Sequence, residues 1–324
     1  MKIMFIGGTG NISTSTSRLC IEQGHDLWLL NRGGVQSLVG AKSLQVDINS
    51  AEAAARLAGH EWDVVVNWIA FTESDVDRDI QLFEGRTAQY IYISSASCYK
   101  KPGPTPFITE RTPLENPHWQ YSRDKIAGEQ RLRREPGFPY TIVRPSHTYD
   151  SVVPITIGGW REYTTVDRIK KGLPIVVQGD GYSLWTLTHA DDFAKGFVSL
   201  FGNSVALRED FHITSDEFLS WNEIYQYVAA AVGKRADIVH VTSDTICKLD
   251  PEYTGTLLGD KSISSLFDNS KIKSLVPDFK AKIRFAEGIK RTIAGFEADP
   301  TKQFVNPETN AFIDQLITYA SKPA

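Results

Sequence analysis

The sequence predicts an α/β protein with a doubly wound parallel sheet and a smaller, mostly C-terminal lobe. Short apolar runs alternate with helical stretches in the first half, the first run leads directly into a glycine-rich turn, and the alternation becomes irregular after about residue 150. Apolar strands that alternate with helices are typical of a parallel sheet covered on both faces. We therefore expect one domain over residues 1–150 and a second lobe over residues 151–324, with some segments of the second returning to the main sheet.

The predicted elements follow the apolar, amphipathic and alanine-rich stretches in chain order. The first half contains a strand at 2–6, a helix at 11–23 that ends before Gly24, a strand at 26–30, a turn at 31–34, a helix at 50–58, a strand at 63–66, a helix at 74–84, a strand at 89–93, a helix at 119–134 and a strand at 140–143. The second half contains a helix at 158–171, a strand at 174–177 and helices at 190–201, 220–232 and 285–297. The crossovers should be right-handed.

Length, charge and cysteine content restrict the class of protein. A chain of 324 residues suits one large α/β unit or two linked ones, and its net charge of -4 argues against a protein built mainly to bind nucleic acid. The basic clusters at 100–101, 131–134 and 170–171 are interpreted as solvated surface. Three distant cysteines form neither a disulfide framework nor a metal-ligand spacing. With no signal-peptide or membrane-span pattern, the sequence predicts a cytoplasmic, enzyme-sized protein with no metal and no membrane partner.

The turn after the first strand has the composition of a dinucleotide-binding loop, Gly-Gly-Thr-Gly-Asn-Ile-Ser over residues 7–13. Gly7 permits the tight turn, and Gly10 lets the backbone approach a pyrophosphate. The helix that begins near Asn11 and Ile12 directs its free N–H groups and positive dipole end toward the anion. Glycine clusters after strands are also ordinary turns, so this motif needs support from elsewhere in the chain.

That support comes from Tyr121 and Lys125, which lie four residues apart and therefore on one helix face. Tyrosine has a pKa of about 10, and a nearby ammonium group lowers it by favouring the phenolate. The pair thus suits proton transfer at an alcohol, although a chance pair on a solvated helix has the same spacing. Ser95 and Ser97 follow a predicted strand, where ligands bind in parallel sheets, or where serines simply satisfy their own backbone.

Along the chain, the glycine turn comes first, the serines after the strand come next and the Tyr121 and Lys125 pair comes last. In this order, the three features resemble the extended short-chain dehydrogenase/reductase family, the NAD-dependent epimerases and dehydratases, whose members include UDP-galactose 4-epimerase. The resemblance covers roughly residues 1–200 and implies a Rossmann-type sheet with a nicotinamide dinucleotide. It implies that Tyr121 is the acid/base, Lys125 holds the nicotinamide ribose and tunes Tyr121, and Ser95 orients the substrate oxygen. The implied cofactor contacts are Gly7, Gly10, Asn11, Ile12, Asn31, Arg32, Asp47, Ile48, Trp68, Ile69, Ala70, Lys125, Pro145 and His147. The implied substrate contacts are Ser97 and Trp185.

Two departures from the family pattern concern the cofactor. Ser13 replaces the usual third glycine, and its hydroxyl is small enough for helix packing and able to reach a phosphate. Asn31 and Arg32 stand where NAD users commonly place an acid for the ribose. Because a guanidinium group can pair with a 2′-phosphate, Arg32 favours NADP over NAD, although it can also be a solvated turn residue that stacks on adenine.

Two further departures concern the substrate. Residues 95–97 lack the acids with which nucleotide-sugar dehydratases expel water, so a 4,6-dehydratase is not expected. Trp185 lies near the position where the family often offers an arginine to a nucleotide diphosphate, and it is predicted to stack on a sugar or aromatic ring instead. A substrate without a nucleotide diphosphate is therefore possible, with alternative cations at Arg161, Lys170 and Lys171.

The sequence thus predicts an NAD(P)-dependent oxidoreductase or epimerase that acts on a secondary alcohol or ketone of a sugar-like small molecule. The choice between epimerase and dehydrogenase stays open. Two other functions remain as alternatives, an RNA-binding protein on an epimerase-like fold and an NADP-binding redox-sensing regulator; the intact Tyr121 and Lys125 pair counts against both. The resemblance also implies that His189, within residues 188–192, is structural, and that a homodimer forms through the helices at 74–84 and 119–134.

Overall fold

A computed structural model describes residues 1–33 and 38–322, so the end of the predicted turn at 31–34 and the last two residues of the predicted second lobe lie outside the described residues. Its main feature is a seven-stranded parallel sheet in the order β12-β7-β5-β4-β1-β2-β3. The strands are β1 Lys2–Ile6, β2 Asp26–Asn31, β3 Lys42–Gln45, β4 Val64–Asn67, β5 Tyr90–Ile93, β7 Tyr140–Pro145 and β12 Asp210–Ile213. The chain runs outward from β1 in both directions, which confirms the predicted doubly wound α/β fold.

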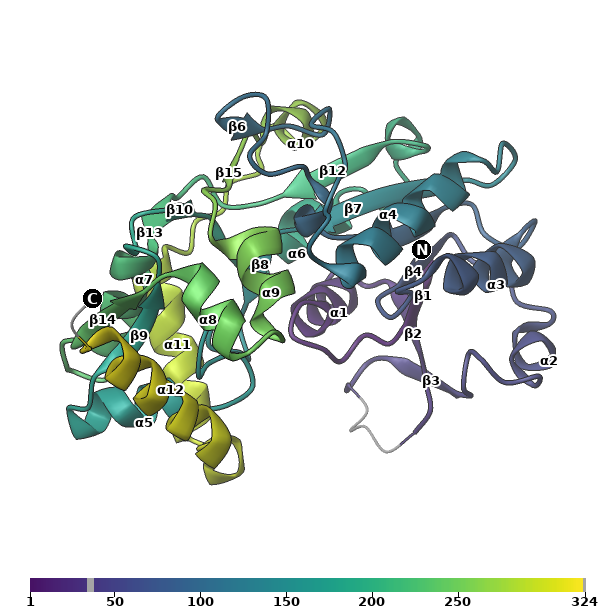
Figure 1. Cartoon of the computed structure of the whole chain (residues 1–324). Coiled ribbons are helices and arrows are strands. Elements are labelled where there is room, and N and C mark those ends of the chain that lie inside the picture. The colour runs from purple at the N-terminus through teal and green to yellow at the C-terminus, as the bar shows by residue number, and fades with distance from the viewer. Residues whose placement is uncertain (34–37, 323–324) are drawn as a thin grey trace.

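Helices cover both faces of the sheet, because successive side chains along each strand point to opposite faces. Ile3 and Phe5 pack on one face beneath α1 (Ser13–Glu22), α6 (Ala190–Val198) and α10 (Ser270–Leu275) (Figure 1). Met4 and Ile6 pack on the other face beneath α2 (Ala53–Leu57), α3 (Glu73–Phe83) and α4 (Gln120–Arg133). The buried strands therefore read as continuous apolar runs.

Helices α3 and α4 lie side by side and are joined by ion pairs from Arg131 to Asp77 and from Arg134 to Glu73. A capping box at Thr72 and Asp75 begins α3, since each residue satisfies a free N–H group of the other. This capping fixes the helix that follows the exit of β4. The homodimer through α3 and α4 stays a prediction.

The second lobe packs mixed helices and short strands around two further apolar clusters, on the left of Figure 1. Its helices are α5 Thr164–Lys171, α7 Trp221–Ala231, α8 Ser243–Leu249, α9 Tyr253–Thr256, the π-helical turn η3 Leu257–Lys261, α11 Phe285–Glu297, the 3₁₀ turn η4 Pro300–Lys302 and α12 Pro307–Ala320. Paired strands are β9 Ile175–Gln178 with β14 Ile238–Val241, and β10 Leu184–Trp185 with β13 Leu219–Ser220. None of the described helices has the length and apolar character needed to cross a bilayer.

Two pairings of short strands and two 3₁₀ turns lie between the elements of the two lobes. β8 His147–Tyr149 pairs with β11 Leu187–His189, and β6 Phe107–Ile108 pairs with β15 Leu266–Phe267. The 3₁₀ turns are η1 Ala96–Cys98 and η2 Ser204–Ala206. β12 comes from residues 151–324 and joins the main sheet beside β7. A segment of the second half thus returns to the main sheet, as expected from the sequence. The domain boundary at residue 150 stays a prediction.

The predicted elements of the first half are present with shifted ends, but two strands of the sheet were not predicted. β3 is an edge strand in which only Leu44 is buried, so its sequence lacks an apolar run. β12 is short and contains Asp210 and His212, whose polar side chains are paired inside the protein. The helix predicted at 158–171 begins only at Thr164, because residues 158–160 form a tight loop with Gly158 in the left-handed region. Helices α8, α9, α10 and α12 were also not predicted.

Candidate active site

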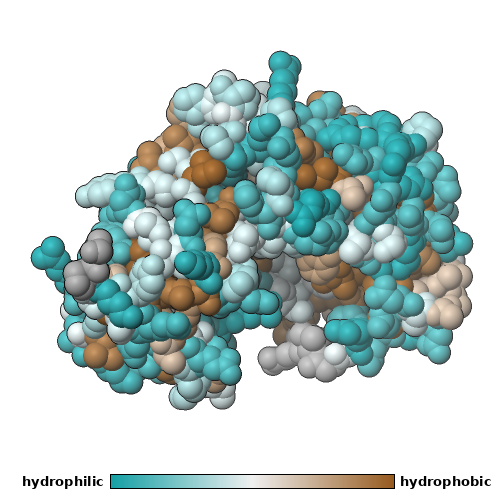
Figure 2. All heavy atoms as spheres, viewed as in Figure 1, coloured by the Kyte–Doolittle hydropathy of each residue, from teal (hydrophilic) through white to brown (hydrophobic). Residues whose placement is uncertain are grey.

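A cavity of about 760 Å³ lies at the carboxyl ends of the central strands, where it is enclosed by both lobes. Figure 2 shows that the molecular surface is hollowed between the two lobes. The sheet side of the cavity is formed by residues 7–13 after β1, by Trp68, Ile69 and Phe71 after β4, and by residues 93–97 at the end of β5. The opposite side is formed by segments of the second lobe. Such a position, where the strand order reverses, is the usual binding site of an open α/β sheet.

Glycine is required in the first turn because the backbone there is both strained and crowded. Gly7 and Gly8 have φ values of 93° and 107°, in the region that side chains disfavour. A Cβ atom at Gly8 would lie 2.7 Å from the Leu29 side chain, and one at Gly7 would touch Trp68 at 3.4 Å. The turn therefore brings bare backbone to the cavity wall.

The N-terminus of α1 faces the cavity without a side-chain cap, because Ile12 occupies the cap position. Such a terminus can accept an anion. The Ser13 hydroxyl accepts a hydrogen bond from the Gly10 N–H at 2.8 Å, which holds the loop and leaves its own O–H free to donate, so its contact with a phosphate stays a prediction. The Asn11 amide donates to the Thr148 carbonyl at 2.8 Å, which ties the loop to β8. These residues fit a pyrophosphate through backbone groups.

Lys125 is buried beneath the cavity floor, where its Nζ donates to the carbonyls of Ile93, at 2.7 Å, and Ala70. The same ammonium lies 5.7 Å from the ring centroid of Tyr121. Both side chains line the cavity, so the spacing predicted from the sequence does bring them together.

The pKa values of this pair differ from the prediction. Burial lowers the pKa of Lys125 to about 7 and raises the pKa of Tyr121 to about 12, while Ser95 opposes the rise at Tyr121. A lysine that is only partly charged at neutral pH exerts a weaker field, which explains why burial dominates at the phenol. In this structure Lys125 therefore does not lower the pKa of Tyr121.

A chain of hydroxyl groups follows β5. The Ser95 hydroxyl lies 2.8 Å from that of Ser97, which lies 2.7 Å from that of Ser122. Ser95 also caps η1 by accepting from the Ser97 N–H at 3.2 Å. Ser94 donates to the Glu129 carboxylate at 2.6 Å. Both serines line the cavity, but Ser97 is buried and Ser95 is partly exposed, so Ser95 is the more accessible of the two to a substrate oxygen.

The predicted cofactor residues divide into two groups. Those that line the cavity are Gly7, Gly10, Asn11, Ile12, Trp68, Ile69, Lys125, Pro145 and His147. Those that do not are Asn31, Arg32, Asp47, Ile48 and Ala70. Asn31 and Asp47 accept hydrogen bonds from the N–H groups two residues later, at 3.0 and 2.9 Å, and Ile48 is buried in the core. Arg32 is exposed at the end of β2.

Pro145 is the last residue of β7, and His147 begins β8 just after that strand of the main sheet ends. His147 is about nine-tenths buried, and neither of its ring nitrogens has a partner among residues 1–33 and 38–322. Burial and the nearby Lys261 ammonium hold the pKa of His147 well below its ordinary value. A neutral imidazole in the cavity wall can donate one hydrogen bond and accept another.

Further cavity residues that the sequence did not indicate come from two parts of the chain: Lys101 and Trp119 from residues 1–150, and Thr156, Trp160, Thr256, Asp260 and Lys261 from the second lobe. Lys101 is buried and forms an ion pair with Asp260 from η3, which corrects its interpretation as solvated surface. This ion pair could not be predicted because the two residues are far apart in the sequence. The pair places one carboxylate beside cations at the substrate end of the cavity.

Of the proposed alternative cations, only one reaches the cavity. Arg161 lines the cavity, whereas Lys170 pairs with Glu297 and Lys171 pairs with Asp167, each at 2.7 Å, away from it. Trp185 lines the cavity and is buried, and the Lys101 ammonium lies 4.8 Å from its ring centroid. The Trp185 indole N–H has no hydrogen-bond partner within the described chain. A hydrogen bond from this N–H group to a ligand therefore suits Trp185 better than stacking of its buried ring.

Comparison with known proteins identifies the family. The model of the NAD dependent epimerase/dehydratase family matches residues 3–213. The chain belongs to this family. It is 28% identical over 255 residues to the chloroplast stem-loop binding protein of 41 kDa b from Arabidopsis thaliana, covering 74% of this chain and 65% of that protein, so it spans less than two thirds of that relative. It is 23% identical over 290 residues to 2'-dehydrokanamycin reductase from Streptomyces kanamyceticus, covering 87% of this chain and 81% of the reductase.

Solved structures share the fold at low identity. UDP-glucuronic acid 4-epimerase from Bacillus cereus, in complex with NAD, superposes with a TM-score of 0.72 at 15% identity. The superposition covers 92% of this chain and 99% of the epimerase. At that identity the likeness shows the fold alone. The family-model match over residues 3–213 thus confirms the assignment made from the sequence, and the shared fold agrees with it.

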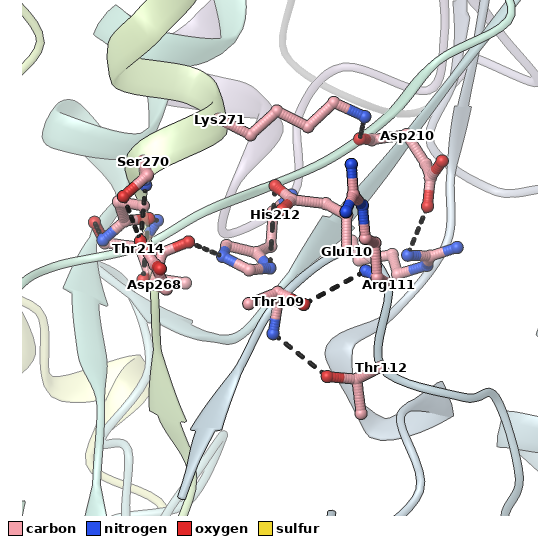
Figure 3. Close-up of polar contacts among 12 residues, drawn as sticks. Thr109, Glu110, Arg111, Thr112, Asp210, His212, Thr214, Asp268, Ser270 and Lys271 are labelled. Atoms are coloured by element: carbon pink, nitrogen blue, oxygen red, sulfur yellow. Dashed lines mark hydrogen bonds and ion pairs between the residues drawn. The ribbon is translucent and has the colours of Figure 1, made fainter. Parts of the chain in front are cut away.

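Behind the serine chain, this family member has a buried polar network that holds η1 against β7 and β12. Arg144 forms two hydrogen bonds with Glu129, at 2.8 and 2.6 Å, and an ion pair with Asp210 at 2.6 Å. It also donates to the Tyr99 hydroxyl at 3.0 Å, which lies 3.1 Å from His212 Nδ1. The network continues through His212 to the loops around β6 and β15. Figure 3 shows His212 between Glu110 and the Asp268 carbonyl.

We expect His212 to make the stability of the protein sensitive to mild acid. Burial lowers its pKa to about 4. The unfolded chain therefore takes up a proton before the folded one, and the stability present above about pH 6.5 is lost as the pH falls toward 4. Between pH 7 and pH 5, the free energy of unfolding should fall by about 2 kcal/mol less in His212→Gln than in the wild type, as measured by urea unfolding. The exposed His118→Gln is the control, and equal falls in wild type and His212→Gln would refute the assignment.

Proposed function

We propose that this protein is a nicotinamide-dinucleotide-dependent oxidoreductase or epimerase that acts on a secondary alcohol or ketone of a sugar-like substrate. One observation carries the proposal: the bare glycine turn, Ser95, Tyr121 and Lys125 line one continuous cavity. The names of two similar proteins, a 2'-dehydrokanamycin reductase and an epimerase in complex with NAD, support the same chemistry.

The residues of the cavity suit separate parts of that reaction. When bound, a nicotinamide dinucleotide supplies or accepts the hydride. Tyr121 takes the proton from the substrate hydroxyl during oxidation, or gives its proton to the substrate oxygen during reduction. Ser95 donates a hydrogen bond to that oxygen and fixes its position. Lys125 holds the ribose of the cofactor. Because burial raises the pKa of Tyr121 to about 12, its hydroxyl is protonated at neutral pH and can donate its proton directly when a ketone is reduced.

The test combines cofactor binding with turnover. Calorimetric titration of cofactor-free protein with NAD⁺, NADH, NADP⁺ and NADPH should show binding of at least one pair. Oxidation of the preferred reduced cofactor should then be followed with a panel of keto sugars, and epimerisation with UDP-glucose, UDP-glucuronic acid, glucose 6-phosphate and kanamycin. If no dinucleotide binds, the proposal is wrong. Tight retention of NAD with no net redox turnover would identify an epimerase.

Arg32 is expected to select NADP, because it is exposed at the end of β2 and no carboxylate stands at residues 31–32. Replacing a guanidinium that pairs with a phosphate should cost about 10-fold to 100-fold in affinity. Arg32→Glu should therefore weaken NADPH binding by that factor and leave NADH binding unchanged, as measured by calorimetry. Arg56→Glu on α2 changes the same charge elsewhere on the surface and should alter neither. An unchanged NADPH to NADH ratio in Arg32→Glu would exclude this role.

RNA binding is a second candidate, favoured by the name of the Arabidopsis relative, a stem-loop binding protein. Phosphate contacts would make the affinity for RNA fall steeply with salt. Filter binding of a labelled stem-loop at several salt concentrations tests it. Binding with a steep salt slope, together with an absence of turnover on the sugar panel, would favour the RNA-binding function over the enzyme.

A further inference from the structure

Trp160 occupies a backbone conformation that its side chain makes unfavourable. Its φ is 60°, in the left-handed region, and it is one of two non-glycine residues with positive φ within residues 1–33 and 38–322. Gly158 and Gly159 come directly before it, so the chain places glycine in this loop where geometry needs it. A tryptophan at the third position therefore calls for an explanation.

The loop around Trp160 holds it in that conformation. The N–H and C=O of Trp160 both bond to Val153, at 2.6 and 3.0 Å. A Cβ atom at Gly159 would lie 2.1 Å from the Ile155 side chain, so the loop packs closely against that residue. The surrounding packing thus fixes the direction in which the indole projects.

Burial of the indole does not offset this conformational cost, because Trp160 remains 44% exposed. Its side chain lines the cavity at the second-lobe side, and its ring centroid lies 5.2 Å from that of His147. By contrast, Trp185 is buried and its ring contacts Lys101 and Trp221. Of these two tryptophans, Trp160 is therefore the one whose ring is open to a ligand.

Polar groups without partners lie in the wall of the same cavity, and those of His147 lie beside the open ring. Both ring nitrogens of His147 and the indole N–H of Trp185 are buried in the cavity wall and lack hydrogen-bond partners in the described part of the chain. An apolar ring face next to such groups suits a cyclic polyol, which offers C–H bonds on its face and hydroxyl groups at its edge.

We propose that Trp160 is the stacking platform for the sugar ring of the substrate and that it determines the specificity for cyclic substrates. This inference rests on the proposed function. The strained backbone is retained because it directs the indole over the substrate position, with His147 and Trp185 bonding to the hydroxyl groups of the ring.

The experiment compares Trp160→Gly, Trp160→Phe and wild type, each saturated with the preferred dinucleotide. Calorimetry measures binding of UDP-glucose, UDP-glucuronic acid, glucose 6-phosphate and kanamycin, and thermal unfolding measures stability. Trp160→Gly should bind the preferred sugar about 10-fold to 100-fold more weakly, and Trp160→Phe should recover most of that affinity. Affinity for the dinucleotide should not change. The midpoint of unfolding of Trp160→Gly should lie within about 2 °C of the wild-type value or above it, because glycine accepts positive φ.

Arg208→Gly is the matched control, since Arg208 is the other non-glycine residue with positive φ, at 63°, and does not line the cavity. It should leave sugar binding unchanged. A larger drop in the unfolding midpoint of Trp160→Gly would show that the indole is structural, and unchanged sugar binding would show that it contacts no substrate; either result overturns the inference alone. If the wild-type protein binds none of the four sugars, the proposed sugar-like substrate fails, and this inference fails with it.

Discussion

Tyr121→Phe should lower turnover by about 10²-fold to 10⁴-fold, the usual contribution of a positioned acid or base. The substitution removes only the hydroxyl. The phenyl ring can keep the contacts that Tyr121 makes with Trp119 and Phe71, at centroid distances of 5.1 and 6.3 Å, so the cavity should keep its shape. Steady-state rates with the preferred dinucleotide and the best substrate of the sugar panel give the measurement.

Cofactor binding separates loss of chemistry from loss of structure in this variant. Tyr121→Phe should bind the dinucleotide as tightly as the wild type, and its unfolding midpoint should be similar. Tyr182→Phe removes a hydroxyl from a side chain that is 72% exposed and should have wild-type rates. Turnover of Tyr121→Phe within a few fold of wild type would exclude Tyr121 as the acid/base.

The residues that could be predicted from the sequence are those whose partners lie nearby in the chain. The glycine turn combines a strand, its exit and the next helix within 13 residues, and Tyr121 and Lys125 share one helix face. Local spacing therefore determines their geometry. The direction of the Tyr121 pKa could not be predicted, because it depends on burial by both lobes, which spacing does not describe.

The substrate side of the cavity could not be predicted for the same reason. Asp260 lies 159 residues from Lys101, and η3, which carries it, is a π-helical turn without a distinct sequence pattern. The φ of Trp160 results from the packing of its loop against Val153 and Ile155 and has no signature in the sequence. Long-range packing thus positions the groups that would distinguish one substrate from another.

Glu129→Ala should cause the largest loss of stability, about 3–5 kcal/mol in the free energy of unfolding, because it leaves the buried Arg144 guanidinium without its main partner. Glu129 is fully buried and accepts two hydrogen bonds from Arg144 and one from Ser94. Asp210 still pairs with Arg144 but is partly exposed and cannot replace both bonds. Urea unfolding at pH 7 measures the loss.

Two variants show whether burial of the ion pair is the cause. Glu115→Ala removes the exposed partner of Lys100 and should cost less than about 1 kcal/mol, the usual contribution of a surface ion pair. Glu129→Gln keeps the shape and should fall between the two. Because Ser94 adjoins Ser95, both Glu129 variants should also lower turnover beyond any loss of folded protein, whereas Glu115→Ala should not. A loss of stability for Glu129→Ala as small as that for Glu115→Ala would contradict this prediction. It would mean that Asp210 and the Tyr99 hydroxyl alone compensate the Arg144 charge. It would also mean that η1 and the contact with Ser122 hold the serine segment without this network.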